Sequence, residues 1–145
     1  MNTLKRSAVV PYSARQMFEL VNGIEDYPRF LPWCGKSRVV TRSDAEVVAE
    51  LEIAWKGMHK GFSTRNTLSP YHAMEMSLIT GPLKHMLGKW QFIDINDNGC
   101  KVLLDLEFEF TGGIIDMIFQ PIFQSIANSL VDAFCQRAVE LYGRE

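Results

Sequence analysis

The feature that most constrains the fold is a long apolar segment near the C-terminus, residues 114–142. Apolar side chains occupy 18 of its 29 positions, and only four positions carry charge. The segment directly before it, residues 100–110, alternates apolar and charged side chains, which is typical of a strand with one buried face. A helix this apolar needs a surface to cover it. The pair therefore predicts a sheet closing around a helix, an arrangement that can leave a lipophilic cavity between the two layers.

Length and composition indicate one domain, residues 1–145, that buries a core without disulfide or metal staples. The chain is 47% hydrophobic and 22% charged, with a net charge of −2 and a pI near 5.9. This balance provides no global attraction to DNA, so we expect no DNA partner, and RNA binding would need a local basic patch.

The three cysteines, Cys34, Cys100 and Cys135, are too widely spaced for a CxxC metal site and too few for a disulfide framework. They favour a reducing cytoplasm. No apolar region of a secretory signal follows residues 1–7, and the charge-free run 117–131 is shorter than the ~20 apolar residues that span a bilayer. We expect a soluble chain, with peripheral, transient contact with the inner membrane left open.

The order of elements predicts an α+β fold. Residues 4–10 form a strand, Ser13 and Gln16 fit a capping box for a short helix ending near Val21, and residues 24–32 form a second short helix or turn. About six sequential strands follow from Arg38 onward. Short turns join them, including a hairpin at residues 96–99, which favours a curved antiparallel sheet of six to seven strands.

Pro121 interrupts the apolar C-terminal segment, because an interior proline removes a helix hydrogen bond. We expect a kink or a fresh helix start there. Residues 114–120 would then form a separate apolar turn, interpreted as a lid, and the helix that follows would cover the sheet.

Several strings in the expected order resemble the coenzyme Q-binding proteins of the polyketide cyclase and START-like helix-grip superfamily, whose bacterial members include the ribosome association toxin. The resemblance covers nearly the whole chain, and the string from Tyr27 to Cys34 is the most specific. The strings are Val10-Pro11-Tyr12-Ser13 with Met17-Phe18, Tyr27-Pro28-Arg29-Phe30-Leu31-Pro32-Trp33-Cys34, Gly81-Pro82-Leu83-Lys84, Gly88-Lys89-Trp90-Gln91-Phe92, Leu106-Glu107-Phe108-Glu109-Phe110 and Asp132-Ala133-Phe134-Cys135-Gln136-Arg137-Ala138.

The resemblance implies a helix-grip fold in which a curved antiparallel sheet wraps around a long C-terminal helix. It also implies non-catalytic binding of ubiquinone or a related isoprenoid lipid in a hydrophobic tunnel, which supports respiratory electron transport. The alternative that it implies is a toxin that binds the large ribosomal subunit and blocks subunit joining. No cofactor is expected other than a ubiquinone-like lipid as ligand.

The candidate ligand-binding residues are apolar or aromatic side chains that face the space between sheet and helix, together with one polar side chain. An ordinary filled core is the alternative interpretation. The candidates are Trp33, Phe62, Asn66, Met74, Met76, Leu78, Trp90, Phe92, Phe108, Phe110, Ile118, Phe119, Ile122, Phe123, Ile126 and Leu130.

Two of the inner positions raise specific expectations. Strand parity places Thr64 and Asn66 inward, where a buried Asn must bond to protein, water or a ligand carbonyl. The alternative, which this pattern favours, is that the protein itself provides the hydrogen-bond partner of this Asn. Trp33 is interpreted either as the mouth of the cavity or as a cap on one end of the core.

The charged residues give no catalytic pattern. Asp105, Glu107 and Glu109 alternate on an outer face and are expected to pair with basic neighbours such as Lys89, Lys101 or Arg65. The three histidines lie near predicted turns without a Ser, Cys or carboxylate partner. We therefore expect no enzyme and no metal site. A modest basic cluster for a ribosomal contact consists of Arg29, Lys36, Arg38 and Arg42.

Overall fold

A computed structural model describes residues 2–97 and 99–143 of the chain. Seven strands, two α-helices and one 3-10 helix follow one another in these described parts. In chain order they are β1 (Asn2–Val10), α1 (Ala14–Asn22), the 3-10 helix η1 (Ile24–Arg29), β2 (Cys34–Arg42), β3 (Glu46–Trp55), β4 (Met58–Ser69), β5 (Ala73–Thr80), β6 (Leu83–Asn96), β7 (Gly99–Phe110) and α2 (Ile114–Tyr142).

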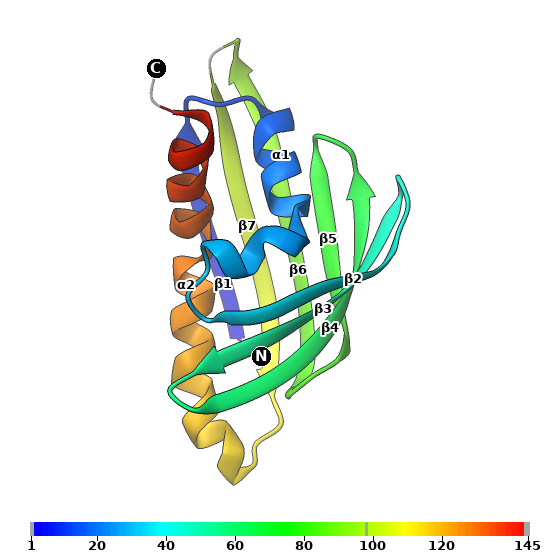
Figure 1. Ribbon diagram of the computed structural model, residues 1–145, viewed down its shortest axis with the longest axis vertical. Helices are drawn as coiled ribbons and strands as arrows, with labels where there is room; N and C mark the ends of the chain where they lie inside the picture. Colours follow the sequence, from blue (N-terminus) through cyan, green and yellow to red (C-terminus); the bar gives the residue numbers. More distant parts are fainter. Residues whose placement is uncertain (1, 98, 144–145) are drawn as a thin grey trace.

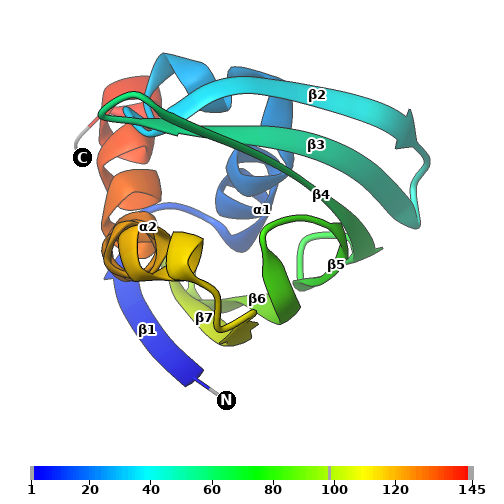
Figure 2. The ribbon, with the colours of Figure 1, turned by 90° about the horizontal axis from the view of Figure 1, so that it is seen from below.

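All seven strands form one antiparallel sheet in the order β1-β7-β6-β5-β4-β3-β2. Consecutive strands from β2 to β7 pair through short turns, and β1 returns to pair with β7. Figure 2 shows this sheet curling so that α2 lies within its concave side. The predicted α+β class and helix-grip architecture are confirmed.

Irregular pairing helps the sheet to bend, because a bulge locally increases twist. Register shifts occur at five places, including Ser63/Thr64 in β4 and Leu83/His85 in β6. Pairing between β5 and β6 runs only from Ala73–Gln91 to Ser77–Leu87. Beyond this point the two strands separate towards their hairpin.

The first short helix begins as the sequence predicts. The Ser13 side-chain oxygen accepts a hydrogen bond from the Gln16 amide at 3.1 Å, and the Gln16 side chain accepts one from the Ser13 amide at 2.9 Å. Asp94 on β6 accepts a further bond from the Ala14 amide at 2.9 Å. These bonds satisfy three backbone N–H groups that a helix start leaves open, and they attach α1 to the sheet.

Helix α2 packs along the concave face and closes the core (Figure 1). Its buried stripe recurs at helical spacing, and the opposite face is polar and exposed, with Gln124, Asn128, Asp132, Gln136 and Glu140. Helical spacing would extend the buried stripe to Leu141, but Leu141 is 51% exposed at the helix end. The buried stripe consists of Phe119, Phe123, Ile126, Ala127, Val131, Phe134 and Ala138.

Two tyrosines attach the C-terminal end of α2 to the beginning of the chain. The Tyr142 hydroxyl donates to the Gln16 carbonyl at 3.3 Å, and the Tyr12 hydroxyl donates to the Gly143 carbonyl. The two rings lie 5.6 Å apart. The C-terminal end of the helix is therefore held at the same end of the molecule as α1.

Pro121 bends α2 but does not divide it. The helix is continuous from Ile114 to Tyr142, and its first turns lean away from the axis of the rest in Figure 1. The predicted kink is present, but the separate lid is wrong. Ile118 is 65% exposed, and Ile114 and Met117 are exposed as well. The helix tolerates the proline because only one hydrogen bond near its start is lost.

Some element boundaries differ from the predictions. Strand β2 begins at Cys34 rather than Arg38, because its two register shifts break the alternation of apolar and polar residues. The alternation along β3 would bury Trp55, but Trp55 is 40% exposed beside the β3–β4 turn. The predicted hairpin joins β6 to β7, although its Asn98 lies outside the described residues. No helix in the described part of the chain has the length and apolarity to cross a membrane.

Candidate functional site

The candidate site is an inner cavity of about 90 Å³ between α2 and the concave face of the sheet. Helix α2, the 3-10 helix η1, the segment before β2 and strands β3 to β7 all contribute to its wall. The lining residues are Ile24, Tyr27, Trp33, Ala49, Leu51, Ile53, Phe62, Thr64, Asn66, Met76, Met86, Trp90, Leu106, Phe123, Ile126, Ala127, Leu130 and Phe134.

The structure brings half of the sixteen predicted site residues to this wall: Trp33, Phe62, Asn66, Met76, Trp90, Phe123, Ile126 and Leu130. Met74, Phe92, Phe108 and Phe119 are buried in the core without lining the cavity. Leu78, Phe110 and Ile122 are half-buried outside the lining. Ile118 is exposed and lies outside the lining.

Ten lining residues are not among the sixteen predicted site residues, although strand parity had already placed one of them, Thr64, inward. Strand parity could have found Ala49, Leu51 and Ile53 on β3, and the helical stripe could have found Phe134. No periodic pattern in the sequence indicates that Ile24 and Tyr27 of η1 line the cavity. The remaining missed residues are Met86, Leu106 and Ala127.

The cavity is small because aromatic rings fill most of the space beneath α2. The Phe134 ring lies 5.4 Å, centroid to centroid, from each of Tyr27, Phe30 and Trp90. Binding sites for drug-sized ligands typically enclose about 300–1,000 Å³. The cavity in this structure is smaller than such a site, and an isoprenoid chain would enter only after side chains or α2 move outward.

Only three side chains in the lining carry hydroxyl or amide groups. Tyr27 donates its hydroxyl to the Val21 carbonyl, and burial raises the pKa of this phenol. Thr64 and Asn66 lie together on β4, where the Thr64 hydroxyl donates to Asn66 Oδ1 at 3.0 Å. Both are buried, as their strand parity predicts. The lining holds no Asp, Glu, His, Lys, Arg or Cys, so general acid–base chemistry has no carboxylate or imidazole to use there.

A surface hollow of about 260 Å³ adjoins the inner cavity. Trp33 and Ile126 line both spaces, so their side chains form the partition between them. The exposed Trp55 and the half-buried Ile122 contribute to the outer side. This geometry is compatible with the prediction of Trp33 as a mouth, and that role stays a prediction.

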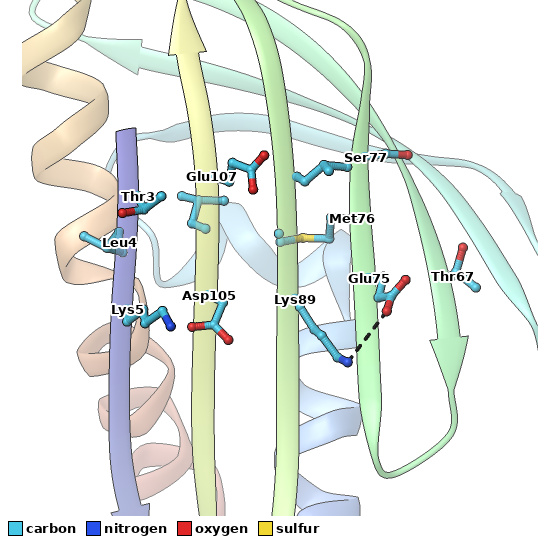
Figure 3. Close-up of a pocket in the computed structure, with 13 residues that line it drawn as sticks. Thr3, Leu4, Lys5, Thr67, Glu75, Met76, Ser77, Lys89, Asp105 and Glu107 are labelled. Carbon is cyan, nitrogen blue, oxygen red and sulfur yellow. Dashed lines mark ion pairs between the residues drawn. The ribbon is translucent and has the colours of Figure 1, made fainter. Parts of the chain in front are cut away.

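An outer groove of about 520 Å³ lies on the opposite face of the sheet (Figure 3). Its polar members include Lys5, Asp105 and Glu107, and Lys89 pairs with Glu75 at 3.7 Å. Met76 and Leu106 line both this groove and the inner cavity. Met76 pairs with Gly88, and Gly88 pairs with Leu106, so the two hollows adjoin across this glycine in the middle of the sheet.

The acidic row on β7 faces outward as predicted, with different partners. Glu109 pairs with Lys84 at 3.2 Å, and Glu107 contacts His85 at 3.2 Å. The hydrogen bond from Lys84 holds the pKa of Glu109 below its usual value. The expected partners Lys89 and Arg65 pair with Glu75 and Glu46 instead.

The cysteines show no features of reactive thiols. Burial raises the pKa of both Cys34 and Cys100 to about 11, so neither is a thiolate at neutral pH. All three cysteines are free. Across the described residues, no group of three or more His, Cys, Asp or Glu side chains is arranged to hold a metal ion.

The predicted basic cluster is largely neutralised by neighbouring carboxylates. Arg29 pairs with Asp26 at 3.1 Å, Arg42 with Glu25 at 2.8 Å, and Arg38 with Glu50. These pairs are exposed and contribute little to stability. They also reduce the net positive charge that the cluster presents to RNA.

Comparison with known proteins identifies relatives over nearly the whole chain. Residues 10–135 match the family described as polyketide cyclase / dehydrase and lipid transport. The ribosome association toxin RatA of Pseudomonas aeruginosa is 44% identical over 140 residues, with 97% of each chain covered. The mitochondrial coenzyme Q-binding protein COQ10 homolog B of Xenopus laevis is 25% identical, with 96% of this chain and 59% of the relative covered.

Solved structures share the fold. The Zhui aromatase/cyclase from Streptomyces sp. R1128 superimposes with a TM-score of 0.82 over 99% of both chains. Its sequence identity is 15%, so this likeness concerns the fold alone.

Proposed function

Because the chain belongs to the polyketide cyclase / dehydrase and lipid transport family, we propose that it is a non-catalytic binding protein whose main activity is association with the ribosome. The observation that carries this proposal is the 44% identity to a ribosome association toxin over 97% of each chain. The resemblance found in the sequence specifies the partner as the large ribosomal subunit and the effect as blocked subunit joining. The inner cavity, with no titratable side chain except Tyr27, supports a role without catalysis.

Overexpression followed by sucrose-gradient profiling tests this function. We expect free subunits to accumulate at the expense of joined ribosomes, and the protein to sediment with the large subunit. A Phe134→Ala variant, which should lose much of its core packing, controls for the effect of expression itself. An unchanged ratio of joined to free subunits would overturn the proposal.

The second candidate function is binding of a hydrophobic ligand in the inner cavity. It is favoured by a lining of eighteen residues without a charged side chain at neutral pH and by the name of the COQ10 relative. We propose ubiquinone or a related isoprenoid lipid as the ligand class, with entry past Trp33 and Ile126 and transient contact with a membrane during loading. Apolar contact of about 25 cal/mol per Å² would provide the affinity and would have to offset the cost of opening the core.

Organic extraction of purified protein, followed by mass spectrometry, tests for a co-purifying lipid. Titration with a decyl-substituted benzoquinone can be followed by fluorescence, because Trp33 and Trp90 line the cavity. We expect saturable quenching that an Ala49→Leu variant weakens by occupying the space. Absence of both a co-purifying lipid and saturable quenching would overturn this candidate without affecting the ribosomal one.

A further inference from the structure

The inner cavity has one polar point in an otherwise apolar wall, formed by Thr64 and Asn66 on β4. The two side chains are 5% and 3% exposed and both contribute to the lining. Asn66 faces Met76 of β5 on one side and Val47 of β3 on the other, so its backbone lies in the middle of the sheet. The side-chain amide of Asn66 is therefore surrounded mainly by apolar side chains and is shielded from bulk water.

Bonding within the protein satisfies only one end of this amide. Asn66 Oδ1 accepts the Thr64 hydroxyl at 3.0 Å. Among the described residues, no hydrogen bond from Asn66 Nδ2 accompanies this one, and Nδ2 is not among the fully buried side-chain atoms left without a partner. Asn66 lines the cavity, which provides space for an acceptor beside these N–H groups, and Asn66→Leu would remove the donors while keeping a side chain of similar size. The Thr64–Asn66 bond thus fixes the orientation of the amide and leaves its N–H donors available to the cavity.

We infer that Asn66 is a specificity-determining residue that donates a hydrogen bond to an acceptor oxygen of a hydrophobic ligand. This inference rests on the second function proposed above, ligand binding in the inner cavity. Thr64 is the positioning residue, because it acts on the ligand only through the amide of Asn66. The ligand class is an apolar molecule with a carbonyl oxygen, such as a ketone, quinone or ester.

The other side chains that line the cavity restrict the class of ligand further. No carboxylate faces the cavity to bind a cation, and no Lys or Arg faces it to bind a phosphate or carboxylate. Asn66 Oδ1 has already accepted one hydrogen bond from Thr64, so the Asn66 amide offers two N–H donors against one remaining acceptor site on its oxygen. A carbonyl group matches because it accepts and does not donate.

Two ring compounds of matched shape test the inference: cyclohexanone and methylenecyclohexane, which differ only in a carbonyl oxygen or a methylene group. Binding is followed by nuclear magnetic resonance of the ¹⁵N-labelled protein, with the Asn66 side-chain N–H signals assigned by their loss in Asn66→Leu. We expect cyclohexanone to bind about fivefold more tightly, as one net hydrogen bond would give, and to shift these N–H signals. Asn66→Leu should bind both rings equally and should retain or raise the melting temperature.

Thr64→Val provides a second variant that keeps the Asn66 donors. It should reduce the preference for cyclohexanone without abolishing binding of either ring. Equal binding of the two rings by the natural chain, with unmoved Asn66 signals, would overturn the inference and leave hydrophobic binding intact. A lowered melting temperature in Asn66→Leu with an unchanged preference would assign Asn66 a structural role instead. If neither ring binds, ligand binding in this cavity fails together with the inference.

Discussion

The inner cavity and the outer groove lie on opposite faces of one sheet, and the smaller of the two has the lining better suited to binding a ligand. The outer groove is the larger, at about 520 Å³ against about 90 Å³. Its wall, however, contains solvated ions such as Lys89 and Glu75, whose mutual contact competes with water. The small cavity has apolar walls and one oriented amide. The chemistry of the lining, more than the volume, therefore distinguishes a candidate binding site here.

Removing a ring from the inner wall should have the largest effect. Phe134→Ala deletes contacts with Tyr27, Phe30 and Trp90, and we expect a loss of about 3–5 kcal/mol in the free energy of unfolding. Leu87→Ala in the outer groove is the matched control, because Leu87 is exposed; its loss should stay below about 1 kcal/mol. Urea denaturation measures both. Similar losses would show that the two faces do not differ in packing.

The buried thiols should make stability fall at alkaline pH. Burial raises the pKa of Cys34 and Cys100 to about 11 from an ordinary value near 9. Their stabilising contribution is complete below pH 9 and is lost as the pH rises towards 11, because the unfolded chain releases these protons first. Each thiol should cost about 1.4 kcal/mol per pH unit within that window. Urea melts of the natural chain and a Cys34→Ala/Cys100→Ala variant measure this difference; identical pH profiles would contradict it.

Filling the inner cavity should stabilise the protein and impair ligand binding. Ala49 is buried in the lining, and Ala49→Val adds two methyl groups towards the open space. We expect a gain of about 0.5–1 kcal/mol in the free energy of unfolding, together with weaker quenching by the decyl-substituted benzoquinone. Thermal melting and the fluorescence titration provide the measurements. A loss of stability would mean that the cavity cannot accept even this volume.

The smallest effect is expected in the outer groove. Glu75→Gln removes the ion pair with Lys89, whose atoms are 3.7 Å apart on an exposed surface. The free energy of unfolding should change by less than about 0.5 kcal/mol. Raising the salt concentration should reduce even this difference between the natural chain and the variant. A change above about 2 kcal/mol in urea denaturation would contradict the solvated character of the groove.

Local periodicity was enough to predict most of the fold. Alternation identified the inward position of Asn66 on β4, and the capping pair Ser13–Gln16 fixed the start of α1. The cavity volume could not be predicted, because it depends on how the rings of Tyr27 and Phe134 meet across distant parts of the chain. Ile118 was chosen because residues 114–120 were expected to form a lid, but they are the first turns of a continuous helix, and their apolar composition did not indicate that Ile118 faces solvent.

The row of paired residues Met76, Gly88 and Leu106 has a consequence for how this protein can change by mutation. Met76 and Leu106 belong to both hollows, and a Cβ on the neighbouring Gly88 would lie 2.6 Å from Met76 Cε. Even an alanine at position 88 would displace the flexible Met76 side chain and so reshape the space on the other side. Met76 and Leu106 thus contact both the outer surface and the interior. Selection on one face is therefore also selection on the other, and the two cannot evolve independently.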